Sequence, residues 1–120
     1  MADIPAGHKL TPEFIENVIV DEYYFTAGEG LEGALVKSME GAGRIAAMHA
    51  NPALDYVTIC VMVLANGFTV VGVNHGPADP ANFDAELGKD YARRNAVDQI
   101  WPLEGYLLKQ MLAEKAHATE

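Results

Sequence analysis

The sequence contains a single cysteine, Cys60, and a single serine, Ser38. One cysteine excludes an internal disulfide and fits a reducing compartment. The residues around Ser38 match no nucleophile elbow, so a serine nucleophile is not expected. No apolar segment reaches the roughly 18 residues of a membrane span. The first residues also lack the basic and apolar regions of a signal peptide, so neither feature is expected.

Positive charge is also scarce. Lys and Arg number 8 against 17 Asp and Glu, which gives a formal net charge of −9. Because no basic run can follow a phosphate backbone, binding to DNA or RNA polymers is not expected. A small anion remains compatible with this composition. A few donors at a helix N-terminus can outweigh distant charge, which salt screens beyond about 10 Å.

The length of 120 residues indicates one domain covering 1–120, with a modest core. Such a domain hides roughly two-thirds of its unfolded surface, so subunit association would supplement the core. The hydrophobic patterns favour an α+β fold. They predict a small antiparallel sheet with two C-terminal helices, preceded by an N-terminal helical turn and a helical insertion.

The N-terminal half predicts a short helix beginning at Thr11-Pro12 and a strand within residues 18–26. Residues 31–49 have helical spacing, interrupted by glycines at 41 and 43, and end at an Asn-Pro pair. The spacing of the glycines at 28, 30 and 33 matches the G-x-G-x-x-G consensus of dinucleotide-binding proteins. The rest of that motif's strand–helix–strand unit is not evident, so this stretch is interpreted as a loop.

The C-terminal half begins with a nearly continuous apolar run over 56–64 and a second run over 68–74. Asn66-Gly67 between them predicts a hairpin, because both residue types tolerate positive φ. The hydrophobicity of the second run indicates a central strand, or a face covered by helices or another subunit.

A long helix is expected next. Asp79 is a good N-cap with Pro80 at the first helical position, and the helix is predicted over about 80–100. Pro102 is expected to end or kink it, so that a second helix continues to about residue 115. The predicted inner faces consist of the large apolar residues Phe83, Leu87, Tyr91, Val97 and Trp101, and then Leu103, Tyr106, Leu107 and Met111.

Catalytic and metal-binding patterns are not evident. Cys60 lies among apolar residues and is interpreted as inert packing. The four histidines, at 8, 49, 75 and 117, lack metal-ligand spacing, so no metal or other cofactor is expected. Glu86 and Asp90 share a helix face and could serve acid–base chemistry or hold a cation, but a plain solvated face is the favoured interpretation.

One loop has the chemistry of a small-anion site. Asn74, His75 and Asp79 precede a predicted helix N-terminus, whose free N–H groups favour an anion. Arg93 and Arg94 lie more than two turns further along, at about 5.4 Å per turn, and would reach that end only across a subunit interface. The alternative is a cap, a loop and two surface arginines.

The C-terminal segments resemble a known family, the small tailed-phage proteins that include the first Thoeris anti-defence protein. The resemblance covers about residues 54–112 and extends weakly to residues 23–27. It rests on the segments Thr58 to Val61, Asn66 to Gly72, Asp79 to Gly88, Ala92-Arg93 and Ile100 to Leu108. The loop over 73–78 departs from the Ser-Ala-Cys-type stretch of many relatives and is one residue longer, so ligand specificity would differ if it touches ligand.

This resemblance implies a non-enzymatic sponge in the cytoplasm of the infected bacterial host. The family binds glycocyclic ADP-ribose signals without cleaving them, and some members also bind cyclic di- or trinucleotides of CBASS systems. It implies homo-oligomers, as dimers or as hexamers built from three dimers, with sites between subunits. The family's aromatic, polar-loop and arginine ligand residues correspond to Phe68, to Asp79 or Asn82, and to Arg93 and Arg94.

Two other functions remain open from the residues alone. The first is an adaptor whose helix face around Trp101, Tyr106 and Met111 binds a host protein. The second is an enzyme that cleaves such nucleotides with Glu86 and Asp90. Together with the loop candidates, the predicted ligand-binding residues are Phe68, Asn74, His75, Asp79, Asn82, Arg93 and Arg94.

Overall fold

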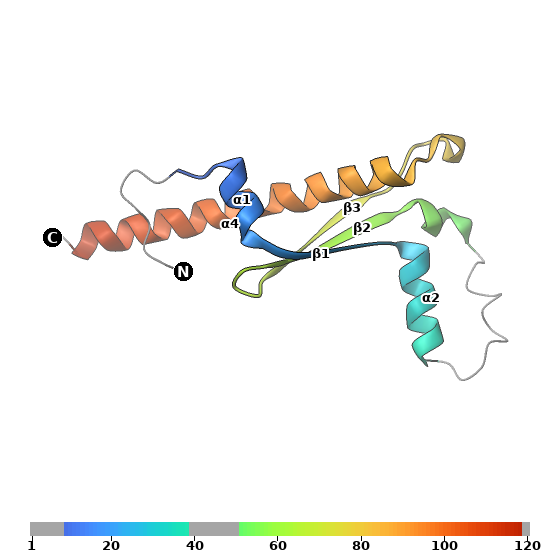
Figure 1. Cartoon of the computed structure of the whole chain (residues 1–120), viewed down its shortest axis with the longest axis horizontal. Helices are drawn as coiled ribbons and strands as arrows, with labels where there is room; N and C mark the ends of the chain where they lie inside the picture. Colours follow the sequence, from blue (N-terminus) through green and yellow to red (C-terminus); the bar gives the residue numbers. More distant parts are fainter. Residues whose placement is uncertain (1–8, 39–50, 119–120) are drawn as a thin grey trace.

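The structure is a computed structural model that describes residues 9–38 and 51–118. Figure 1 shows a three-stranded sheet and a long helix, α4 (Ala85–Ala118), that runs across one of its faces and continues beyond it. The radius of gyration is 19.6 Å, against roughly 14 Å for a compact domain of this length. The predicted α+β class is confirmed, and the single chain leaves much of its surface uncovered.

The sheet is antiparallel, with the strand order β1-β2-β3. Its strands are β1 (Ile19–Thr26), β2 (Thr58–Leu64) and β3 (Thr69–Asn74), so the predicted strands and hairpin are confirmed. The turn differs in detail, because only Gly67 has a positive φ, of 89°. The Gly67 amide donates to the Leu64 carbonyl, which makes Ala65-Asn66-Gly67 a three-residue loop rather than a two-residue turn.

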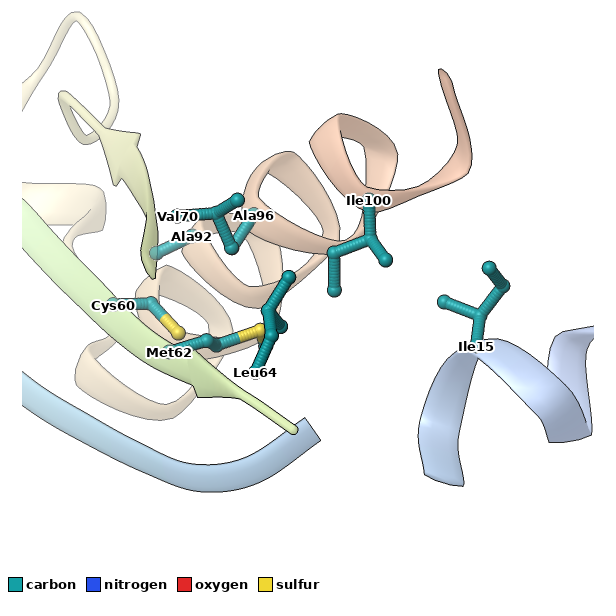
Figure 2. Packing of buried hydrophobic residues seen from close by; sticks show 8 residues of the cluster. All are labelled: Ile15, Cys60, Met62, Leu64, Val70, Ala92, Ala96 and Ile100. Atoms are coloured by element: carbon teal, nitrogen blue, oxygen red, sulfur yellow. The ribbon is translucent and has the colours of Figure 1, made fainter. Parts of the chain in front are cut away.

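Helix α4 packs on β2 and β3 through small residues (Figure 2). A Cβ built on Gly72 of β3 would lie 2.9 Å from the Cβ of Ala96 and closer still to the Ala92 backbone. Only glycine therefore lets the helix come this near. The fully buried apolar residues form one cluster: Ile15, Cys60, Met62, Leu64, Val70, Ala92, Ala96 and Ile100.

The predicted inner face of the C-terminal helix is confirmed at Val97 and Trp101, which pack against the core, and was wrong at four other positions. The buried line follows Gly88, Ala92, Ala96, Ile100 and Glu104, whereas the predicted inner residues Leu87, Tyr91, Leu103 and Tyr106 are exposed. Small side chains are selected on the inner face because the helix lies so close to β3. The large apolar side chains are consequently left on the outside of the single chain.

The two C-terminal helices predicted from the sequence form a single continuous helix. Helix α4 passes through Pro102 without ending. Pro102 and Asp98 are both exposed, so the Asp98 carbonyl that loses its helical donor can be hydrated. Packing of Ile100 and Glu104 on either side of the proline holds the helix together.

The predicted start of this helix was also wrong. Asp79 caps the short 3₁₀ helix η3 (Pro80–Asn82), in which its carboxylate accepts from the Ala81 amide at 3.0 Å. Asp84 caps α4 instead, since its carboxylate accepts from the Leu87 amide at 3.1 Å and its carbonyl from the Gly88 amide.

The N-terminal elements are α1 (Pro12–Val18), capped by Thr11 as predicted, and α2 (Ala27–Ser38). Helix α2 begins four residues before the predicted start, and the rest of the predicted helix lies outside the described residues. Thr26 and Glu29 form a reciprocal capping box at its start. The glycines at 28, 30 and 33 therefore lie in a helix rather than in a loop. The 3₁₀ helix η2 (Pro52–Tyr56) then leads into β2.

The outer edge of β3 is covered by two side chains of α4. The Asn95 side-chain oxygen accepts from the Val73 amide at 3.0 Å, and the Gln99 side-chain amide donates to the Val71 carbonyl at 2.6 Å. These contacts occupy backbone groups that an exposed edge strand would otherwise offer to another strand. Association with another chain at this edge is therefore disfavoured.

Candidate functional site

A groove lies where β3 ends and α4 begins. Its volume is about 280 Å³. The end of β3, the following loop, the residues around η3 and the first two turns of α4 all contribute to it. The lining residues are Asn74, Gly76, Pro77, Asn82, Phe83, Asp84, Leu87, Gly88 and Tyr91.

The loop that forms one wall of the groove packs closely against η2. Gly76 has a φ of 81°, which favours glycine, and its amide donates to the Asn74 side-chain oxygen at 3.0 Å. A Cβ on Gly76 would approach the Tyr56 carbonyl to 2.8 Å. The Tyr56 ring in turn meets the Phe83 ring edge-on, with the ring centres 5.2 Å apart. The groove wall is thus held by packing on η2 as well as by the loop itself.

The helix N-terminus at this groove already carries a carboxylate. Asp84 lines the groove and bonds to the Leu87 amide, which places a negative charge where an anion would bind the helix end. A bare phosphate would meet repulsion there. The rest of the lining includes two aromatic and two amide side chains, those of Phe83, Tyr91, Asn74 and Asn82. A flat, hydrogen-bonding ring therefore fits this groove better than an anion does.

A cation close to this groove is part of a stacked pair. The Arg94 guanidinium lies 5.6 Å from the centre of the Tyr91 ring, at cation–π distance. Tyr91 lines the groove, while Arg94 lines a neighbouring hollow of about 370 Å³ together with Asp90, Arg93, Val97 and Asp98. The Tyr91–Arg94 pair therefore lies between the groove and this hollow, on the exposed side of α4.

Arg93, by contrast, is occupied by carboxylates of the same chain. It donates to both oxygens of Glu16, at 2.9 and 2.7 Å, and through its Nε to Glu22 at 3.0 Å. These bonds raise the pKa of Arg93 and lower the pKa of Glu22. The Tyr24 hydroxyl donates to Glu22 at 2.6 Å, and burial raises the pKa of Tyr24 and that of the neighbouring Cys60 thiol. The network joins α1, β1 and α4.

A scan against protein-family models matches most of the chain. Residues 10–112 match the phage protein family described as N4 Gp49/phage Sf6 gene 66. The chain belongs to this phage protein family. The matched region runs from the residue before the α1 cap through most of α4 and includes the entire groove. Searches of curated proteins and of solved structures give no match.

The structure brings together only some of the predicted site residues of this phage protein. Asn74 and Asn82 line the groove, while the exposed residues His75 and Asp79 belong to the same loop region without lining it. Phe68, 53 % exposed, lies at the hairpin and so at the other end of β3, roughly 20 Å away along six strand residues. Within one chain it does not join the groove.

The sequence interpretation missed the aromatic wall of the groove. The repeat of Phe83, Leu87 and Tyr91 at every fourth position predicts that they are core residues. The signal that identifies the true inner face is the parallel series of small residues, Gly88, Ala92 and Ala96, which permits close helix–sheet packing.

Other candidate groups are placed as follows. Glu86 pairs with Lys89 at 3.6 Å on the exposed side of α4. Cys60 is fully buried under α4, in agreement with the packing interpretation. Within residues 9–38 and 51–118, no group of three or more His, Cys, Asp or Glu side chains could hold a metal ion; His8 and His49 lie outside this part. No helix of the described chain is both long and apolar enough to cross a membrane.

Proposed function

We propose that this phage protein is a sponge that binds and holds, without cleaving, immune signalling nucleotides of the cyclic ADP-ribose type in the cytoplasm of the infected bacterial host. Its ligands would be glycocyclic ADP-ribose isomers and, at the same or a second site, CBASS cyclic oligonucleotides. The proposal joins the sequence resemblance to Thoeris anti-defence proteins with the chemistry of the groove at the start of α4.

The observation that carries the proposal is the Tyr91 ring, which faces the groove while Arg94 lies against it. A base can stack on an exposed tyrosine, and such stacking contributes about 1–3 kcal/mol per base. The amides of Asn74 and Asn82 can both donate and accept, as the edge of an adenine requires. The planar fork of Arg94 suits a pyrophosphate reaching into the neighbouring hollow.

The size of the groove also supports an assembly of several chains. Small-molecule pockets span about 300–1,000 Å³, so a groove of about 280 Å³ accommodates a base and part of a sugar but not a whole cyclic dinucleotide. The remainder would rest in the Arg94 hollow or against another subunit. A homo-oligomer, as a dimer or a hexamer of three dimers, would close the groove and could bring in Phe68 from a second chain.

Sequestration requires only affinity and abundance. A Kd of 1 nM corresponds to about 12 kcal/mol at the standard state, and this is the range that a stoichiometric sponge needs. Because one stacked base supplies only a small share, the proposal expects several polar contacts and a largely enclosed ligand.

Calorimetric titration with glycocyclic ADP-ribose isomers tests these residues. Tyr91→Ala and Arg94→Ala should each raise the Kd by about 10-fold or more, equivalent to losing one stacking or charged contact. Tyr106→Ala is the matched control, because Tyr106 is 76 % exposed on the same helix and far from the groove. Equal affinity of all three variants and the natural protein would remove the groove from the proposed site.

A second candidate function rests on the C-terminal half of α4. Leu103, Tyr106 and Leu112 are 39 %, 76 % and 52 % exposed there, and Gly105, Leu108 and Leu112 line a shallow hollow of about 420 Å³. An adaptor that binds a host protein would use this face. A stoichiometric host protein recovered with the natural chain, lost with Leu112→Glu and accompanied by no nucleotide, would favour the adaptor over the sponge.

A further inference from the structure

The groove at the start of α4 is lined by one charged side chain, and its charge is negative. Of the described residues that line the groove, only Asp84 is an acid or base that is charged at neutral pH. The nearest cations have other partners: Lys89 pairs with Glu86 at 3.6 Å, and the Arg94 guanidinium lies against the Tyr91 ring. Within the described part of the chain, no ion pair joins a cation to Asp84. Its carboxylate is therefore not neutralised by the protein around it.

The same carboxylate occupies the N-terminus of a long helix. Helix α4 has 34 residues, and such an end attracts phosphate, because its first amides lack a helical acceptor and the dipole is positive there. The first helical hydrogen bond runs from the Gly88 amide to the Asp84 carbonyl, so the amides of Ala85 and Glu86 precede it. The Leu87 amide donates to the Asp84 side chain at 3.1 Å. A phosphate would thus meet a carboxylate at the place where these amides would otherwise bind it.

Asn74 contributes a hydrogen-bond donor to the same lining. Its side-chain oxygen accepts from the Gly76 amide at 3.0 Å, so its NH₂ group is the part that remains for a ligand. Asp84 offers only acceptors. The edge of a nucleobase suits a lining of this kind, because it presents N–H donors beside nitrogen or carbonyl acceptors. A phosphate has acceptor oxygens alone, so it matches Asn74 but not Asp84.

We propose that Asp84 determines specificity in this groove, by admitting the base of a nucleotide and excluding its phosphate end. This inference rests on the proposed function and deepens it. The base enters first and stacks on Tyr91, while the charged part stays outside, towards Arg94.

The ligands that this arrangement excludes are linear nucleotides. Every cell contains AMP, ADP and ATP, and a terminal phosphate carries a charge of about −1.5 to −2 at pH 7. Repulsion by Asp84 prevents that phosphate from anchoring at the N-terminus of α4 and filling the groove. A cyclic nucleotide has no terminal phosphate and does not depend on this helix end. Specificity is gained here by disfavouring the wrong ligand, without any added contact to the right one.

The charge of Asp84 can be separated from its role as a helix cap. Asn and Ser cap helices about as well as Asp does, because each also offers an oxygen to the first amides. Asp84→Asn and Asp84→Ser therefore keep an acceptor for the Leu87 amide and remove only the negative charge. Both variants are expected to fold, so a change in ligand binding reports the charge and not the loss of the cap.

Inorganic pyrophosphate and AMP are the probes for the excluded end. An NMR titration at low ionic strength follows the amide signals of Ala85, Glu86 and Leu87. Asp84→Asn should bind either anion about 10-fold more tightly than the natural chain, because an opposing charge beside the phosphate is gone. Asp84→Ser should change in the same direction. The difference should shrink in 1 M salt, where the screening length is about 3 Å.

Glu114→Gln is the matched control, since it removes one negative charge near the other end of the same helix, outside the groove. It should leave the affinity for pyrophosphate within about 2-fold of the natural value, because salt screens so distant a charge. The exclusion is overturned if Asp84→Asn binds pyrophosphate and AMP no better than the natural chain does. An equal gain for Glu114→Gln, or a difference that does not shrink in 1 M salt, overturns it as well.

The exclusion and the sponge can fail separately. If the natural chain retains glycocyclic ADP-ribose but Asp84→Asn gains no affinity for AMP, the exclusion alone is refuted. If Asp84→Asn gains affinity for pyrophosphate and no cyclic nucleotide is retained by the natural chain, the sponge alone is refuted.

Discussion

The Arg93 guanidinium forms a two-pronged pair with the Glu16 carboxylate, in hydrogen bonds of 2.9 and 2.7 Å. The residues are 77 positions apart, and their contact fixes α1 against α4. Glu22 of β1 accepts from the same guanidinium. An arginine that looks available for phosphate in the sequence thus holds three elements of its own chain together. Arg94, the next residue, faces Tyr91 instead.

The two adjacent arginines should consequently differ in their effects on stability. Arg93→Ala should lower the free energy of unfolding by about 1–2 kcal/mol, because it leaves Glu16 and Glu22 without their shared cation at a partly exposed site. Arg94→Ala should change it by less than about 0.5 kcal/mol, as at other surface positions. Urea unfolding of both variants checks this, and an equal loss for the two would contradict the structural role of Arg93.

Glu22 should make stability depend on pH in the acid range. Its pKa lies below the ordinary value of 4.5, first because Arg93 donates to it and then because Tyr24 does. A carboxylate with a lowered folded-state pKa stabilises the fold fully above about pH 4.5, and this contribution is lost as the pH falls through the lowered pKa. Glu22→Gln should flatten the acid limb of a plot of unfolding free energy against pH. If the natural protein and Glu22→Gln show the same slope of unfolding free energy against pH below pH 4.5, Glu22 does not make this contribution.

Gly72 should tolerate no side chain. Gly72→Ala pushes a methyl group into the backbone of α4 at Ala92 and Ala96, and overpacking of this kind costs about 1–3 kcal/mol or more. Gly33→Ala is the matched control, since nothing lies within 4 Å of its added Cβ and alanine favours the α2 helix by up to about 1 kcal/mol. Thermal unfolding should move down for the first and not for the second. Two similar shifts would show that α4 does not lie this close to β3.

The two aspartates near the groove should differ as helix caps. Asp84→Ala removes the cap of the 34-residue helix α4 and should cost about 1 kcal/mol. Asp79→Ala removes the cap of a three-residue 3₁₀ turn and should cost less. Chemical denaturation of the two variants measures the difference. A larger loss of unfolding free energy for Asp79→Ala than for Asp84→Ala would indicate that the long helix is capped by Asp79, as the sequence predicts.

The strands and the hairpin follow from sequence because their signals are local. The apolar runs on either side of Asn66-Gly67 and the Thr11-Pro12 helix start depend on neighbouring residues alone. The α2 start also has a local signal, the Thr26 and Glu29 capping box, but the glycines that follow it favour a loop. Helix propensity of glycine is poor in isolation, and here the cap outweighs it.

The groove and the helix face could not be derived in the same way, because they depend on distances between elements. Periodicity shows that Leu87 and Tyr91 share a stripe, but not that Gly72 draws the opposite stripe onto the sheet. The continuity of α4 through Pro102 likewise depends on the packing of Ile100 and Glu104. The role of Arg93 required knowing that α1 lies beside α4, which no local pattern encodes.

A retention-and-release experiment tests the central claim most directly. The purified protein is mixed with glycocyclic ADP-ribose isomers and cyclic di- and trinucleotides, separated from unbound ligand and denatured by heat, and the released molecules are identified by mass spectrometry. The sponge account predicts intact ligand at about one molecule per site, lost with Tyr91→Ala and kept with Tyr106→Ala. Altered ligand, or no retained nucleotide, would contradict it.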